Sequence, residues 1–558
     1  MRGTTPPRHV ASAFTVACIV VSLIGLLVPP ALVAIPPLLD YPNHLARLHV
    51  LSEALIKGRD SPFYAVHLSG TWLNVAKDWL GVALSYAIPT GQAGSVLVGL
   101  AVLLPPTGAI VLNRTIFRTW HWWQIAFALF AWNSSLVVGL LSFQIGVGIA
   151  LLAAAADAAW QSRSGSAARF ISRMAIAALL LAVHPFATAL YAALLAGLVA
   201  GAAIPPGGVR VWLRDRGLDV ATAGLACTIP VVVYVAFTHL PIGGIIPPEA
   251  LNRSEDVGLA IRLFRIFAPL LAPIWSYSIG LDILSLMPLL IIAGAVILSG
   301  AGFRGHVGLL AVLIALTVLT LVVPFYFLGN GATNMRIGSL LGLILMAACI
   351  PAPGFASSRA ARNSLAITLT LVVGLRTGMI CQIWMGSRAD TQAVIAALSH
   401  AERGSRVLPV EHTPSVDGAN RPPWHRAGIG HQPLYWHLAT LAVSERSAFV
   451  PTLFATPGKQ TIVVRPPWDA LAVHEPFLST IQNLALADRN EEALATEPRL
   501  YGYRYLRRWQ QTFDYVLVLN ADRPDRFGPA PRLSSLELVA DEGFAQLWRV
   551  IRPTGRGE

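Results

Sequence analysis

A short polar stretch carries the residue types that chemistry needs, and it follows the first long apolar segment of this 558-residue chain. The stretch reads Asp-Tyr-Pro-Asn-His-Leu-Ala-Arg from Asp40 to Arg47. A proline at a first helical turn, followed by leucines at spacings of three and four, predicts an amphipathic helix lying along a membrane surface. His44 and Arg47 share one face of that helix, and Asp40 precedes its start on the same side. The Asp40 carboxylate could take a proton from a hydroxyl group, or it could simply cap the helix.

A second short helix is expected near residues 72–79, where Asn74 and Asp78 lie four residues apart. Asp78 is a candidate for substrate binding. The alternative is a structural pair with Lys77 or Arg47. His44 likewise could contact substrate or lie on the helix face at the interface.

Four further candidates lie at or near the outer ends of apolar segments. His184 precedes Pro185 between two segments, and Asn334 and Arg336 belong to a short outer loop. For these three, helix breaking, a turn and interfacial anchoring are the alternatives to substrate contact. Arg376 lies inside the last apolar segment, about 13 Å from its outer end, where an ionisable group usually faces a cavity or a partner. We expect Asp40, His44, Arg336 and Arg376 to converge on one cavity open to water and to lipid.

The elements that must position these residues are membrane helices. The chain is 55% hydrophobic and only 13% charged, whereas soluble domains contain about a quarter charged residues. The apolar stretches that could cross roughly 30 Å of hydrocarbon suggest about eleven spans, near residues 11–35, 84–112, 120–135, 136–160, 172–185, 186–205, 218–240, 272–300, 307–328, 337–352 and 364–385. The four cysteines all fall in apolar runs, which excludes a disulfide framework and a cysteine-based zinc site.

The charge pattern predicts the orientation in the membrane. Residues 1–385 hold 22 basic and 11 acidic residues, and residues 386–558 hold 19 and 18, so the net charge of +12 belongs to the membrane part and does not indicate a nucleic-acid partner. The arginines fall in alternate loops, as expected for cytoplasmic segments. We therefore expect a multi-pass membrane protein with a cytoplasmic N-terminus and an extracytoplasmic C-terminal domain.

Two regions are expected outside the membrane: the first loop at 36–83, within a transmembrane domain of residues 1–385, and an extracytoplasmic domain of residues 386–558. The second region alternates helix-like runs with strand-like runs, which predicts a small α/β domain. Helices are expected near 388–402 and 434–445, and strands near 406–410, 461–464, 515–519, 535–540 and 545–551. Its scattered histidines predict no metal site, and it has no Gly-rich phosphate loop.

Together these features resemble the GT-C superfamily of integral membrane glycosyltransferases. The Asp40–Arg47 stretch and the Asn74–Asp78 stretch are most similar to an uncharacterised bacterial branch of that superfamily. The resemblance covers residues 1–385 by architecture. It implies a polytopic α-helical membrane fold and the transfer of a sugar from a polyprenyl-phosphate donor to an extracytoplasmic glycan, lipid or protein. It also implies that Asp40 is the catalytic general base or an acceptor-orienting group.

Substrate contacts would come from His44, Arg47, Asp78, His184, Asn334, Arg336 and Arg376. The leaving phosphate needs a positive partner, which Arg336, Arg47 or Arg376 could supply. The sequence departs from the pattern in one respect. Many relatives have two adjacent acidic residues in the first loop, whereas Asp40 is followed by Tyr41. A divalent metal is therefore left open as a cofactor, no metal ligand is assigned, and His44 or Asp78 would have to replace the missing acid.

Two other classes of protein stay open at this point. A transporter or lipid flippase would also need many spans, but its ionisable groups should lie near the bilayer midplane in broken helices. A non-catalytic membrane anchor for the C-terminal domain would give Asp40 and Arg336 no role. Replacing Asp40 by Asn separates an enzyme from an anchor.

Overall fold

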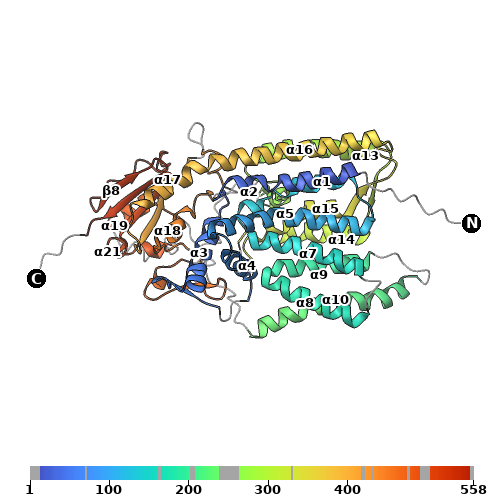
Figure 1. Cartoon of the computed structure of the whole chain (residues 1–558), viewed down its shortest axis with the longest axis horizontal. Coiled ribbons are helices and arrows are strands. Elements are labelled where there is room, and N and C mark those ends of the chain that lie inside the picture. The colour runs from blue at the N-terminus through green and yellow to red at the C-terminus, as the bar shows by residue number, and fades with distance from the viewer. Residues whose placement is uncertain are drawn as a thin grey trace, which may run out of the picture.

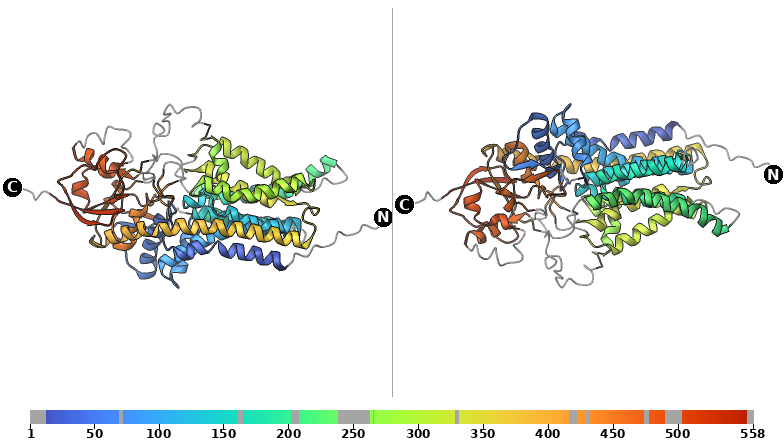
Figure 2. Two further views of the ribbon diagram at one scale, coloured as in Figure 1. Left: turned by 90° about the horizontal axis from the view of Figure 1, so that it is seen from above. Right: turned by 90° about the horizontal axis from the view of Figure 1, so that it is seen from below.

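The structure is a computed structural model, and it describes residues 13–68, 72–160, 165–201, 208–237, 263–264, 266–327, 331–415, 422–428, 432–473, 478–489 and 503–552. Long helices lie side by side in one bundle, and a mixed α/β region lies at one end of it (Figure 1). Two further views show the same end-to-end arrangement (Figure 2). We call residues 388–552 the C-terminal region.

The bundle consists of apolar helices. Seven helices among the described residues are long and apolar enough to cross a membrane: α1 (Ala13–Gly25) with α2 (Val28–Leu32), α5 (Thr90–Phe117), α7 (Leu141–Trp160), α8 (Ser166–Val183), α10 (Gly208–Phe237), α13 (Ile279–Leu298), and α16 (Arg359–Gly386) with α17 (Arg388–Ser399). Three shorter apolar helices accompany them: α9 (Pro185–Ala200), α14 (Val307–Val322) and α15 (Thr333–Ala348). The prediction of a polytopic α-helical membrane protein is confirmed.

The predicted span at 120–135 forms a different kind of helix. Residues Trp122–Phe130 make the nine-residue 3-10 helix η1, and all nine are buried. Near the start of this segment, Trp123 packs against Phe303 at the end of the bundle away from the C-terminal region. Just after the segment, the Val138 carbonyl accepts a hydrogen bond from the Asp40 N–H at the opposite end of the bundle. A 3-10 helix rises about 2.0 Å per residue instead of 1.5 Å, so fewer residues cover the distance. The segment therefore makes the expected crossing in a tighter form.

Basic residues mark the end of the bundle away from the C-terminal region. Arg118 ends α5, and Arg359 begins α16, whose far end leads into α17 (Figure 1). Strand β2 (Phe303–Gly305) pairs with β3 (Cys349–Pro351) in antiparallel fashion between helices of this end. A gathering of positive charge at one end is typical of the cytoplasmic side of a membrane protein.

The first loop forms α3 (Tyr41–Lys57), β1 (Tyr64–Val66) and α4 (Ala76–Ser85). Pro42 lies in the first turn of α3, and Gly58 ends the helix in the left-handed conformation at φ 63°, as a glycine readily does. The helix expected at this position is confirmed, and the rest of the protein covers it. Most residues of its first three turns are buried, including Arg47 and Ser52, because the C-terminal region packs on it.

The C-terminal region is built on a five-stranded mixed sheet of order β6-β4-β7-β9-β8. Its strands are β4 (Val407–Glu411), β6 (Ser479–Thr480), β7 (Tyr515–Leu519), β8 (Leu536–Asp541) and β9 (Ala545–Val550). β4 is parallel to β6 and β7, and β9 is antiparallel to β7 and β8. Around the sheet lie α17 and the short helices η4 (Leu438–Thr440), α18 (Leu441–Arg446), η5 (Trp468–Ala470), α19 (Ile481–Arg489) and α21 (Trp509–Thr512).

The predicted strand at 461–464 exists but does not join this sheet. As β5 (Ile462–Val464) it pairs with β1 of the first loop in antiparallel fashion, with Tyr64 opposite Val464. The Tyr64 hydroxyl also donates to the Val450 carbonyl at 3.1 Å. The first loop and the C-terminal region are therefore joined through backbone pairing, and the candidate site lies where they meet.

Candidate active site

Asp40 lies at the start of α3, at the end of the bundle that faces the C-terminal region. Its side chain makes no capping hydrogen bond to the helix, so helix capping is not what the carboxylate does. Its backbone N–H donates to the Val138 carbonyl at 3.0 Å. Gly139 allows this close approach: its φ is +87°, and a Cβ there would lie 2.8 Å from the Asp40 nitrogen. The backbone of Asp40 is thereby held in place, and the carboxylate is not used by the helix.

The environment of Asp40 changes its acidity. Only 16% of its side chain is exposed. Burial raises its pKa from 3.8 to about 7, although the positive charges of Arg336 and Arg47 act in the opposite direction. A carboxyl group with a pKa near neutrality can both bind and release a proton at physiological pH.

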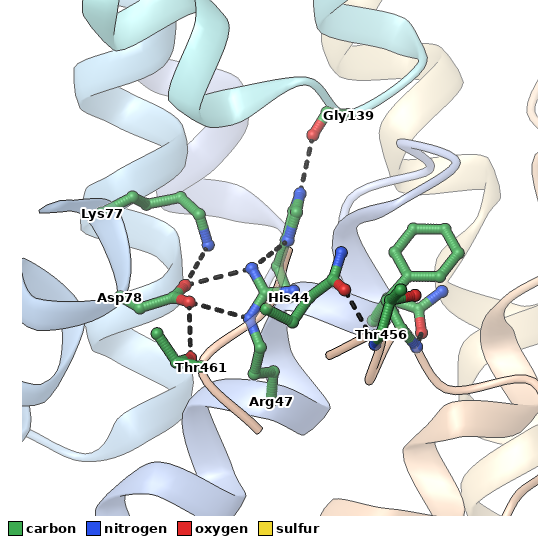
Figure 3. Close-up of polar contacts among 10 residues, drawn as sticks. His44, Arg47, Lys77, Asp78, Gly139, Thr456 and Thr461 are labelled. Atoms are coloured by element: carbon green, nitrogen blue, oxygen red, sulfur yellow. Dashed lines mark hydrogen bonds and ion pairs between the residues drawn. The ribbon is translucent and has the colours of Figure 1, made fainter. Parts of the chain in front are cut away.

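Arg47 is held in a buried charge cluster with Asp78 (Figure 3). Its Nε and Nη2 donate to the two Asp78 oxygens at 2.9 and 3.1 Å. Lys77 Nζ donates to Asp78 at 2.8 Å, and the Thr461 hydroxyl does so at 2.9 Å. The two cations therefore lower the pKa of Asp78, against the effect of burial. With one carboxylate between two cations, the cluster keeps a net positive charge.

His44 supports the same arginine. Its Nε2 lies 3.0 Å from the Gly139 carbonyl and must donate to it, because a carbonyl oxygen can only accept. Nδ1 is then the acceptor, and Arg47 Nη2 donates to it at 3.2 Å. Burial lowers the pKa of His44 well below its usual value, so the ring is neutral. Asp78 and His44 are both expected to contact substrate, but their side-chain polar atoms bond to Arg47 and to other groups of the protein.

Arg336 and His184 lie together at the start of α15 and α9. The His184 Nδ1 accepts a hydrogen bond from the Phe186 N–H at 3.2 Å, so in the neutral ring the proton is on Nε2. Arg336 Nη1 lies 3.4 Å from that Nε2, which places two donors against each other. Arg336 also lies over the Phe186 ring, and its Nε is buried without a partner. Such a pair of converging donors suits an anion.

The last two predicted residues lie in different surroundings. The Asn334 Oδ1 accepts from the N–H of Met335 at 2.9 Å, in the first turn of α15. Arg376 forms a buried ion pair with Asp282 at 3.0 Å and donates to the carbonyls of Trp132 and Ile274 at 3.0 and 2.7 Å. The positive charges of Arg47 and Arg336 thus act on Asp40, and His44 bonds to Arg47, while the bonds of Arg376 go to the helix bundle.

The C-terminal region adds residues that the sequence did not single out. Thr461 bonds to Asp78, as above. His437 Nε2 lies 3.6 Å from Asp40 Oδ1, and the backbone N–H of Phe454 donates to Asn43 at 2.9 Å. No local sequence signal connects these residues to α3, because several hundred positions separate the partners. A lone histidine in a polar region is too common to be noticed.

A metal site is not evident in the part of the chain that the structure describes. Within those residues, no three His, Cys, Asp or Glu side chains gather as metal ligands would. The charged groups around Asp40 are cations, which suit a phosphate group directly.

Comparisons with known proteins reveal a likeness at the level of structure. No family model matches the chain, and no curated protein matches it. Among solved structures, the chain is similar to the crystal structure of ArnT from Cupriavidus metallidurans in the apo state. The two share 13% sequence identity, the match covers 96% of each chain, and the TM-score is 0.42.

Proposed function

We propose that this protein is a GT-C-type glycosyltransferase of the bacterial inner membrane that moves a sugar from a polyprenyl-phosphate donor to an extracytoplasmic acceptor. The single observation that carries the proposal is the environment of Asp40. Its carboxyl group lies where the bundle meets the C-terminal region, 3.6 Å from His437 Nε2. Its pKa is about 7 because burial outweighs the positive charges of Arg336 and Arg47. This is a suitable arrangement for a proton acceptor beside an anion site.

Asp40 is the general base in this proposal. In its ionised form it takes the proton of an acceptor hydroxyl as that oxygen forms a bond to the anomeric carbon of the sugar. A base whose pKa lies near the working pH is the most effective, since it is largely ionised and still binds the proton. The proton on Asp40 then returns to water.

The cations receive the leaving group. As the bond between the anomeric carbon and the phosphate oxygen breaks, the electron pair leaves with the phosphate, which gains charge. Arg336 and the Nε2–H of His184 present donors to that charge, and the net positive Arg47–Asp78–Lys77 cluster lies on the other side of Asp40. Burial strengthens these interactions. The products are the glycosylated acceptor and polyprenyl phosphate.

The orientation follows from the same proposal. The arginine-rich end of the bundle would face the cytoplasm, and the C-terminal region would be periplasmic, with the site at the outer surface. The donor would reach the site from the lipid bilayer, and the acceptor from the periplasm. The domain boundary proposed for this arrangement is at residues 385/386.

The test measures donor consumption. Purified protein in lipid vesicles is incubated with a panel of polyprenyl-phosphate sugars and a cell-envelope acceptor fraction, and released polyprenyl phosphate is quantified by mass spectrometry. We expect Asp40→Asn to lower turnover by at least about 10²-fold. Asp60→Asn is the matched control, because the Asp60 side chain is 83% exposed in the same loop. A correctly folded Asp40→Asn protein with normal turnover would overturn the proposal. The protein would then be interpreted as a membrane anchor or a transporter.

A further inference from the structure

Among the described residues of the C-terminal region, His437 brings its side chain close to the Asp40 carboxylate. We propose that His437 is a positioning residue that donates a hydrogen bond to the Asp40 carboxylate, so that the C-terminal region completes the site. This inference rests on the proposed role of Asp40. It concerns a residue more than 390 positions away in the sequence.

The geometry brings the two side chains close in a protected place. Nε2 of His437 lies 3.6 Å from Oδ1 of Asp40, and only 5% of the histidine side chain is exposed. The ring also packs edge-on against Phe454, with centroids 5.0 Å apart. The separation is longer than a formed hydrogen bond. Charge-assisted hydrogen bonds to a carboxylate are shorter than neutral ones, so we expect the contact to close by a few tenths of an ångström when Asp40 ionises, with no substrate required.

The protonation state of His437 makes this contact a neutral donor and not an ion pair. Burial lowers its pKa to about 3, so the ring carries one proton at physiological pH. Its Nδ1 is buried and has no partner. In the tautomer with the proton on Nδ1, this buried N–H would have no acceptor. The lone pair of Nε2 would then point at the Asp40 carboxylate, and the two would repel each other. A proton on Nε2 instead points at Asp40, and this tautomer is the favoured one.

The charged groups around Asp40 leave a place for such a donor. The positive charges of Arg47 on α3 and of Arg336 on α15 both act on the carboxylate. Lys77 of α4 is connected to Arg47 through Asp78, to which both cations donate. The neutral His44 accepts a hydrogen bond from Arg47 directly. His437 is therefore the contribution of the C-terminal region, and it can fix the carboxylate without adding charge.

The backbone around His437 is anchored on both sides. The His437 carbonyl accepts from the Thr440 hydroxyl at 2.7 Å, which holds the start of η4. Phe454, the neighbour of the ring, is tied to α3 by its N–H bond to Asn43. The β1–β5 pairing then fixes the C-terminal region against the first loop. Positioning of this kind needs such rigidity.

The experiment titrates Asp40 directly and needs no substrate. The infrared band of the protonated Asp40 carboxyl group is obtained as the difference between the protein and Asp40→Asn, in vesicles, across about pH 5 to 9. His437→Phe keeps the ring volume but removes the donor. We expect it to raise the midpoint by about one pH unit, a tenfold increase in proton affinity. His437→Gln, which keeps a neutral N–H donor, should restore the original midpoint.

The controls separate positioning from folding. His412→Phe changes a histidine of the same region whose Nδ1 lies near the Arg523 carbonyl, and it should leave the midpoint unchanged. If His437→Phe does not fold, His437→Met removes the donor with a flexible side chain and should give the same upward shift. An unchanged midpoint in a folded variant without the donor would overturn the inference. The proposed function fails by a different result, normal turnover of Asp40→Asn.

Discussion

At the residue scale, the site is organised by which atoms already have partners. Both oxygens of Asp78 are used by Arg47, Lys77 and Thr461, so we infer that Asp78 positions the two cations and leaves substrate contact to others. The Nε2 atom of His44 and the Nε2 atom of His184 differ in whether they already have an acceptor. The first donates to a carbonyl, whereas the second faces the donor of Arg336 and is available to an anion.

Replacing Arg336 tests that anion site. Arg336→Met keeps an unbranched, flexible side chain of about the length of the arginine's apolar stem, and it removes the charge and the donors. We expect turnover to fall by about 10² to 10³-fold, the usual effect of losing a preorganised donor to developing charge. Arg304→Met is the control, since Arg304 is exposed in strand β2 at the other end of the bundle. Steady-state turnover of both variants decides the matter, and equal activities would show that Arg336 does not meet the phosphate.

At the scale of elements, the close contact between the Val138–Gly139 turn and the start of α3 sets the position of Asp40. The turn follows the 3-10 helix η1, so the crossing by η1 and the placement of Asp40 are connected. The apolar run at 120–135 correctly predicts a crossing but not its type, because a fully buried apolar segment has no period that separates a 3-10 helix from an α-helix. Gly139 likewise gives no local signal of its partner.

Gly139→Ala should therefore reduce both stability and activity. The added Cβ would meet the Asp40 backbone at 2.8 Å, and φ is +87°, so we expect a loss of about 1 to 3 kcal/mol in unfolding free energy with a displaced carboxylate. Gly543→Ala is a matched control, because its φ is +71° with open space around the position. Comparing the two melting temperatures and turnovers isolates the clash. Identical effects would mean that backbone strain alone, and not contact with Asp40, limits position 139.

At the scale of the whole molecule, the site forms only when two distant parts of the chain meet. Asp40, His44 and Arg47 could be placed together from the sequence because one helix presents them. The strands of the C-terminal region could be predicted from their apolar runs, except the two-residue strand β6. The pairing of β5 with β1, and hence the arrival of His437 and Thr461, could not. Nothing in a three-residue strand specifies a partner strand almost four hundred residues away.

The folding stability of the C-terminal region should also depend on pH, through Glu411. Burial raises the pKa of Glu411, at the end of β4, from 4.5 to about 8. The folded protein thus binds this proton more tightly than the unfolded chain does. The protonated Glu411 therefore contributes to the free energy of unfolding below pH 4.5, and this contribution is lost as pH rises toward 8. Glu411→Gln should remove the loss, and its melting temperature should exceed that of the unmodified protein more at pH 8 than at pH 5. The exposed Glu402→Gln serves as the control, and a constant difference across pH would contradict the assignment.

The pH dependence of turnover tests the central claim most directly. If ionised Asp40 accepts the proton, the group is protonated and inactive at low pH, and kcat/KM should rise with pH to a half-maximum at about 7, the pKa of Asp40. The measurement is kcat/KM for polyprenyl phosphate release in vesicles, with stability checked at each pH. A rise with that midpoint supports Asp40 as the base. A profile that is flat through neutrality, or one that falls as pH rises through 7, would contradict it.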